Sequence, residues 1–117
     1  MRERTKKFAL RVIKLVQAMP RTPEGRNIAN QLVRAGTSVG ANYRASCKSR
    51  SRAEFIARMG VVEEEADECY YWLEIIIEAK IMDIDRIQPL LDEAMQLTAI
   101  AAKSRITASR KRQTKEG

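Results

Sequence analysis

The chain has 117 residues, of which 32% are charged, 44% hydrophobic and 5% aromatic, and its net charge is +7. This length suits one domain around one core, and the composition favours helices over sheets. No apolar run reaches the roughly 18–20 residues of a membrane span, and the basic start lacks the apolar segment of a signal peptide, so we expect a cytoplasmic protein that does not contact a membrane.

A first helix is predicted over about residues 3–19, where apolar residues recur at helical spacing and fall on one side. These residues are Phe8, Val12, Leu15, Val16 and Met19. Pro20 ends this helix. Thr22 followed by Pro23 then predicts the N-cap and the first position of the next helix.

The second helix, predicted over about residues 23–48, carries Gly36 and Gly40 on its apolar side. Each glycine costs a helix about 1 kcal/mol relative to alanine, so we expect a compensating contact, namely tight packing against another helix. Another side carries a narrow stripe of cations that continues into the following turn. These cations are the candidate nucleic-acid-binding residues: Arg26, Arg34, Arg44, Lys48, Arg50 and Arg52.

Ser51 followed by Glu54 forms a capping box, which predicts the start of a third helix. An apolar stripe from Phe55 to Ile77 faces the core, and glutamates dominate the far side. Several apolar residues lie among these acids and point away from the core, which indicates a second interface. The candidate oligomer-interface residues are Ile56, Gly60, Tyr71 and Ile75.

A fourth helix is predicted to begin near Asp85, its N-cap, with Pro89 tolerated in the first turn. The basic residues 103–117 are expected to form a disordered C-terminal tail. Four amphipathic helices with short turns predict an all-α, antiparallel, up-down-up-down four-helix bundle over residues 1–102.

Neither a metal site nor a catalytic centre is expected. Cys47 and Cys69 are predicted to be buried free thiols, because successive helices would hold their Cα atoms about 20 Å apart. The chain has no histidine and no CxxC pair, which excludes the usual zinc sites, and Ser38 and Ser46 have no candidate base. We therefore expect no cofactor and no enzymatic activity.

The run Gln31–Asn42, the segment Ser51–Phe55 and the following glutamate-rich helix resemble the four-helix bundle protein family, also called the 23S ribosomal RNA intervening-sequence protein family. The resemblance covers about residues 8–102. It implies a non-enzymatic bundle that assembles into a ring-like homopentamer. A related branch, the accessory variability determinants of diversity-generating retroelements, binds a reverse transcriptase and nucleic acid through a basic surface. Tyr43–Cys47 departs from the commonest family pattern and marks a subfamily.

Charge is segregated along the chain, with a net +11 over residues 1–52, −9 over residues 53–102 and +5 over residues 103–117. One interpretation is that the cationic stripe binds RNA or DNA phosphates in a salt-dependent way. The other is that these cations are solvated or pair with the acidic third helix of a neighbouring subunit. An alternative function is an adaptor or scaffold ring that recruits a protein partner such as a reverse transcriptase.

Overall fold

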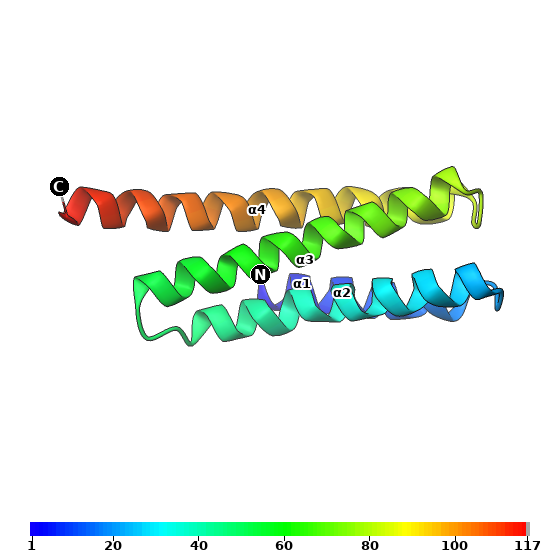
Figure 1. Ribbon diagram of the computed structural model, residues 1–117, viewed down its shortest axis with the longest axis horizontal. Coiled ribbons are helices and arrows are strands. Elements are labelled where there is room, and N and C mark those ends of the chain that lie inside the picture. Colours follow the sequence, from blue (N-terminus) through cyan, green and yellow to red (C-terminus); the bar gives the residue numbers. More distant parts are fainter. Residues whose placement is uncertain (117) are drawn as a thin grey trace.

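The computed structural model describes the backbone of residues 1–116 and the side chains of residues 1–110. Its backbone forms four helices in antiparallel succession, α1 (Arg2–Gln17), α2 (Pro23–Cys47), α3 (Arg52–Glu78) and α4 (Ile84–Glu116), and contains no strand among the residues described. α3 packs along both α2 and α4, α1 packs along α2, and α1 meets α4 over a shorter stretch (Figure 1). The predicted all-α, four-helix architecture is confirmed. No described helix is long and apolar enough to cross a membrane.

The core is one continuous cluster to which every helix contributes its predicted apolar side. Burial of this apolar surface is the main favourable term in folding. The fully buried side chains include Phe8, Val12, Leu32, Val39, Met59, Val62, Leu73, Ile76, Ile87 and Leu97.

The helix ends follow the local chemistry of the sequence. The Thr22 side chain accepts a hydrogen bond from the amide of Gly25 at 3.1 Å, and the Ser51 side chain accepts one from the amide of Glu54 at 3.1 Å. The N-caps predicted at Thr22 and Ser51 are therefore confirmed, whereas the N-cap predicted at Asp85 is wrong, because α4 begins at Ile84 and Asp85 lies in its first turn. Two residues after the end of α3, Lys80 lies in the left-handed region (φ 56°), and its amide donates to the carbonyl of Ile77. The amide of Ile81 donates to the carbonyl of Ile76, which completes a Schellman motif.

Gly36 and Gly40 lie where α1 crosses α2. A Cβ atom at Gly36 would lie 2.9 Å from Cγ1 and 3.0 Å from Cγ2 of Val12, and a Cβ atom at Gly40 would lie 3.3 Å from Oγ1 of Thr5. Both α1 residues are buried. The missing side chains thus allow the two backbones to approach closely, as the sequence predicted.

α4 extends well past residue 102, because its helical backbone continues to Glu116. The prediction of disorder from residue 103 onward is therefore wrong for this backbone. Near the start of this extension, Nε of Arg105 donates to Oε1 of Glu63 at 2.8 Å and so connects this part of α4 to α3. The side chains of residues 111–117, the last part of the predicted basic tail, lie outside the described residues.

The two cysteines differ in environment. Cys69 is completely buried, and burial raises the pKa of its thiol to about 12. Cys47 is exposed at the end of α2, so the expectation of burial is wrong for this residue. Both are free thiols, as expected.

Alanine at the two glycines separates their roles. Gly36→Ala should lower the free energy of unfolding by about 1–3 kcal/mol, the usual range for overpacking, because the β-branched and fully buried Val12 cannot move aside. Gly40→Ala should stay within about 1 kcal/mol of the parent, since the improved helix propensity offsets a milder contact. Urea denaturation measures both values. A Gly36→Ala variant as stable as the parent would contradict this account of the close approach.

Candidate nucleic-acid interface

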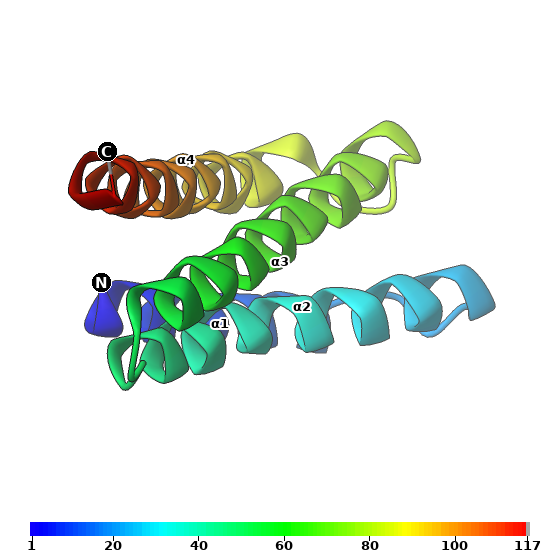
Figure 2. The ribbon, with the colours of Figure 1, turned by 60° about the vertical axis from the view of Figure 1, so that its left-hand side comes forward.

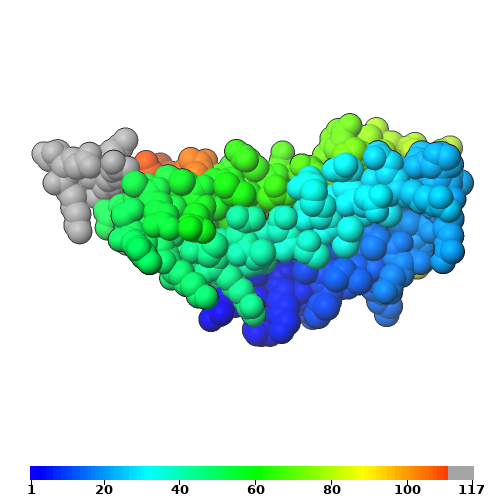
Figure 3. All heavy atoms as spheres, turned by 60° about the horizontal axis from the view of Figure 1, so that its bottom comes forward, coloured from blue at the N-terminus to red at the C-terminus, as the bar shows by residue number. Residues whose placement is uncertain are grey.

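A basic groove runs along the surface between α1 and α2. Its lining comes from two helices, with Arg2, Thr5, Lys6 and Ala9 from α1 and Thr37, Gly40, Ala41 and Arg44 from α2, around a volume of about 270 Å³. Small residues form much of this lining, and three cations flank them. We call this surface the α1–α2 groove; the face that α1 and α2 form is seen in Figure 3.

The groove follows from the same glycines that allow the helices to approach. Because Gly40 and Ala41 carry little or no side chain, a shallow channel remains above the crossing. Arg2, Lys6 and Arg44 are exposed and form no ion pair with another residue of the described part. Their charges are therefore available to an anion in solution.

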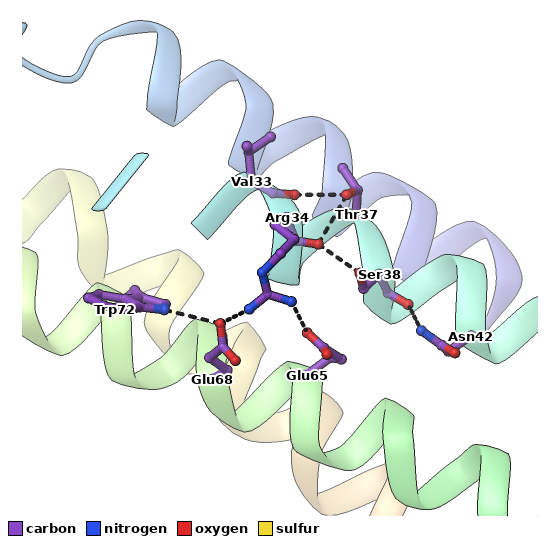
Figure 4. Close-up of polar contacts among 8 residues, drawn as sticks. All are labelled: Val33, Arg34, Thr37, Ser38, Asn42, Glu65, Glu68 and Trp72. Carbon is purple, nitrogen blue, oxygen red and sulfur yellow. Dashed lines mark hydrogen bonds and ion pairs between the residues drawn. The ribbon is translucent and has the colours of Figure 1, made fainter. Parts of the chain in front are cut away.

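Arg34 behaves differently from the rest of the predicted stripe. Its Nη1 donates to Oε2 of Glu65 at 3.2 Å, and its Nη2 pairs closely with Oε2 of Glu68. The same oxygen of Glu68 accepts from Nε1 of Trp72 at 3.2 Å. Figure 4 shows the guanidinium of Arg34 reaching from α2 to the two carboxylates on α3. The hydrogen bond to Glu68 is the main cause that raises the pKa of Arg34.

Neutral polar side chains beside Arg34 bond to their own helix. Thr37 and Ser38 donate from their hydroxyls to the carbonyls of Val33 and Arg34, both at 2.8 Å, and Asn42 donates to the carbonyl of Ser38 at 2.8 Å (Figure 4). Such local bonds are common for these residue types within helices. They add no charge to this side of α2, so any affinity for anions there comes from the cations.

The other predicted nucleic-acid-binding residues are spread along the molecule rather than gathered in one site. Arg26 is exposed near the α1–α2 turn, and Lys48 is exposed as the C-cap of α2. Arg50 is exposed in the turn before α3, where its amide donates to Oε2 of Glu54 at 3.1 Å. Arg52 is half-buried at the start of α3 and lines a different cleft.

The sequence did not single out Arg2 and Lys6, which complete the groove from α1. The signal was present, since both cations lie on the side of α1 that also carries Thr5 and Ala9. Recognising it required knowing which side of α1 faces the glycine side of α2.

Two further arginine–glutamate ion pairs connect α4 to its neighbours α1 and α3. Arg4 of α1 donates from Nε and Nη2 to the two carboxylate oxygens of Glu93 on α4, each at 2.8 Å, and Nη2 also donates to Oε1 of Gln96 at 2.7 Å. The hydrogen bonds from Arg4 lower the pKa of Glu93, and the charges of Arg11 and Lys7 act in the same direction. Together with Arg105–Glu63 between α4 and α3, these contacts pair opposite charges within one chain.

The comparisons with known proteins agree with this architecture. A family model described as 23S rRNA-intervening sequence protein matches residues 1–103. The chain belongs to this family. The structure is also similar, with a TM-score of 0.81 and 25% sequence identity, to the crystal structure of a protein of unknown function from the S23 ribosomal protein family of Bacteroides thetaiotaomicron. That match covers 87% of this chain and 94% of the other chain. The sequence matches none of the curated proteins.

The four predicted interface residues of this family member occupy unlike positions. Tyr71 is 52% exposed, and its ring meets that of Trp72 edge-on with 5.0 Å between centroids. Ile75 packs partly against the core, and Ile56 is half-buried. Gly60 faces α4, since a Cβ atom there would lie 3.8 Å from Cδ of Arg105. The prediction that these residues point away from the core is therefore wrong for Ile75, which packs against it. The role of the four residues in an oligomer stays a prediction.

The Arg4–Glu93 pair predicts a pH dependence of stability. The folded carboxyl of Glu93 has a pKa below its ordinary value of 4.5, so its stabilisation is fully present above the unfolded pKa and is lost as the pH falls through the lower, folded pKa. Glu93→Gln should lower the free energy of unfolding at pH 7 by about 1 kcal/mol and make stability less sensitive to acid. Urea denaturation at pH 7 and pH 3 measures both effects. Equal acid sensitivity in the parent and the variant would contradict the assignment.

Proposed function

We propose that this protein is a non-enzymatic, cytoplasmic nucleic-acid-binding protein whose α1–α2 groove contacts the phosphate backbone of RNA or DNA. The observation that supports the proposal most directly is the convergence of Arg2, Lys6 and Arg44 from two helices onto one channel. Guanidinium and ammonium groups suit phosphate oxygens, and small residues between them allow a sugar–phosphate chain to approach closely.

The lining of the groove also indicates which kind of recognition to expect. Among the described residues, the lining contains three cations and no aromatic ring on which a base could stack. Contacts of this type neutralise phosphates without reading base edges. Binding should therefore be largely independent of sequence and should weaken steeply as salt increases.

Assembly would strengthen such binding. We propose that the chain forms a homo-oligomer, a ring-like pentamer as the family resemblance implies, which would present several copies of the groove to one nucleic acid. Linked copies bind with an avidity above that of one site, provided that the geometry allows simultaneous contact. Modest phosphate contacts in each subunit would then suffice.

A matched pair of charge reversals tests the groove. Arg44→Glu should weaken binding to duplex DNA at 50 mM salt at least tenfold, because it removes a phosphate contact and adds a repulsive charge, while the melting temperature stays near that of the parent. Arg34→Glu makes the same charge change on the same helix, but it places a carboxylate against Glu65 and Glu68. It should lower the melting temperature and affect DNA binding less.

Fluorescence anisotropy with labelled DNA measures the affinity, and circular dichroism measures the melting temperature. Equal losses of affinity in the two variants would show that overall charge, rather than the groove, controls binding. Unchanged affinity of Arg44→Glu would contradict the proposed site.

The second candidate function is an adaptor or scaffold ring that recruits a protein partner, and the exposed aromatic surface on α3 supports the formation of such a ring. Tyr71 leaves half of its surface in solvent, although its ring and that of Trp72 form an ordered pair. Aromatic residues are enriched in the centres of protein interfaces. We propose that this surface is the subunit contact of the ring.

Substitution at this surface should change the oligomeric state. Tyr71→Asp should reduce the molar mass measured by light scattering, because a carboxylate would have to be buried in the contact. Met95→Asp on α4 is a matched control, since Met95 is also 52% exposed, and it should leave the mass unchanged. An unaltered mass for Tyr71→Asp would exclude this surface as the contact.

A further inference from the structure

The four helices differ in length, and the difference leaves one end of the bundle with three helices. α1 has 16 residues and α2 has 25, which at about 1.5 Å per residue leaves α1 shorter by roughly 13 Å. Both helices meet at the α1–α2 turn, so the shortfall lies at the opposite end. There α2, α3 and α4 continue beyond the N-terminus of α1 (Figure 1), and Figure 2 views that end from closer to the axis of the bundle.

A cleft of about 700 Å³ lies at this end, between the start of α3 and the second half of α4. We call it the α3–α4 cleft, and it is lined by Arg52, Phe55, Ile100, Lys103, Ser104, Thr107 and Ala108. Earlier along α4, Glu93 and Gln96 are in contact with Arg4 of α1. The cleft therefore begins where α1 stops covering α4.

The lining has an apolar part and a basic part. Phe55, Ile100 and Ala108 are half-buried, and Phe55 packs against the hydrophobic core. Arg52 and Lys103 add two cations, neither of which forms an ion pair with another residue among those described. No acidic side chain is part of the described lining.

We propose that the α3–α4 cleft docks an acidic amphipathic helix of a protein partner, in the position that a longer α1 would occupy. The cleft is lined by α3 and α4 at an end that α1 does not reach, and a helix suits this space because its apolar side would cover the apolar lining as a fourth helix does in a bundle. Acidic residues flanking that side would meet Arg52 and Lys103. A nucleic acid fits this surface less well, because its phosphates would satisfy the cations but leave the apolar lining uncovered.

This site is separate from the α1–α2 groove, since the two share no lining residue. The inference therefore goes beyond the proposed function and does not depend on it. A single chain could bind nucleic acid on one face and a protein helix at one end.

Three labelled probes added to the full-length protein test the proposal. The first is a synthetic 14-residue helical peptide with leucines on one side and glutamates on the other. The second is the same peptide with lysine in place of each glutamate, and the third is a 15-nucleotide oligothymidine. Anisotropy should show saturable binding of the acidic peptide and at least tenfold weaker binding of the lysine peptide. The oligothymidine should not displace the acidic peptide.

Variants locate the binding. Lys103→Glu should weaken the acidic peptide about tenfold, whereas Arg86→Glu, the same charge change at an exposed site near the other end of α4, should not. Ser104→Trp should fill the cleft and abolish binding, and melting curves confirm that each variant is folded. Arg44→Glu should leave peptide binding unchanged, which separates this site from the groove.

Absence of saturable peptide binding would overturn the proposal. So would equal effects of Lys103→Glu and Arg86→Glu. Displacement of the acidic peptide by oligothymidine would instead assign the cleft to nucleic acid.

Discussion

The close approach of α1 and α2 is the constraint on which the rest of the molecule depends. Gly36 lies against Val12 and Gly40 against Thr5, so the backbone of α2 packs directly against short side chains of α1. This contact requires residues that weaken an isolated helix, and tertiary packing compensates for that loss. The same contact forms the α1–α2 groove above the crossing, where small residues line the groove and cations from both helices flank it.

The segregation of charge along the chain is partly resolved by folding itself. Basic residues early in the sequence meet acidic residues later in it, through Arg34 with Glu65 and Glu68 and through Arg4 with Glu93. These pairs connect α2 to α3 and α1 to α4, whereas α1 and α2 are held together by close packing at the two glycines. The cations beside this packed contact form no ion pair with a carboxylate of the described part. Their charges therefore remain available on the surface to bind an anion.

Much of the fold was predictable, because the signals that determine it are local. Apolar periodicity located the helices, and Thr22 and Ser51 marked two of their starts through caps that form within a few residues. The end of α4 was not predictable in this way, because its polar and basic composition resembles a disordered tail. The contact that connects the start of this extension to α3 joins Arg105 to Glu63, whose positions are distant in the sequence.

The candidate site was only partly predictable for a related reason. A helical wheel placed Arg34 and Arg44 on one stripe, but it could not show that Arg34 leans toward α3 while Arg44 borders α1. The wheel describes one helix, whereas the availability of a charge depends on the neighbouring helix. The contributions of Arg2 and Lys6, and the cleft beyond the start of α1, likewise depend on how helices of unequal length are aligned.

The two cysteines lie in different environments, which allows one of them to be labelled selectively. The thiolate is the form of cysteine that reacts with electrophilic thiol reagents, and the high pKa and complete burial of Cys69 keep its sulfur unreactive. Cys47 is exposed at the end of α2, between Arg44 of the groove and Arg52 of the cleft in the sequence. A fluorophore or spin label attached to the native chain would therefore sit at one defined position from which both surfaces can be observed.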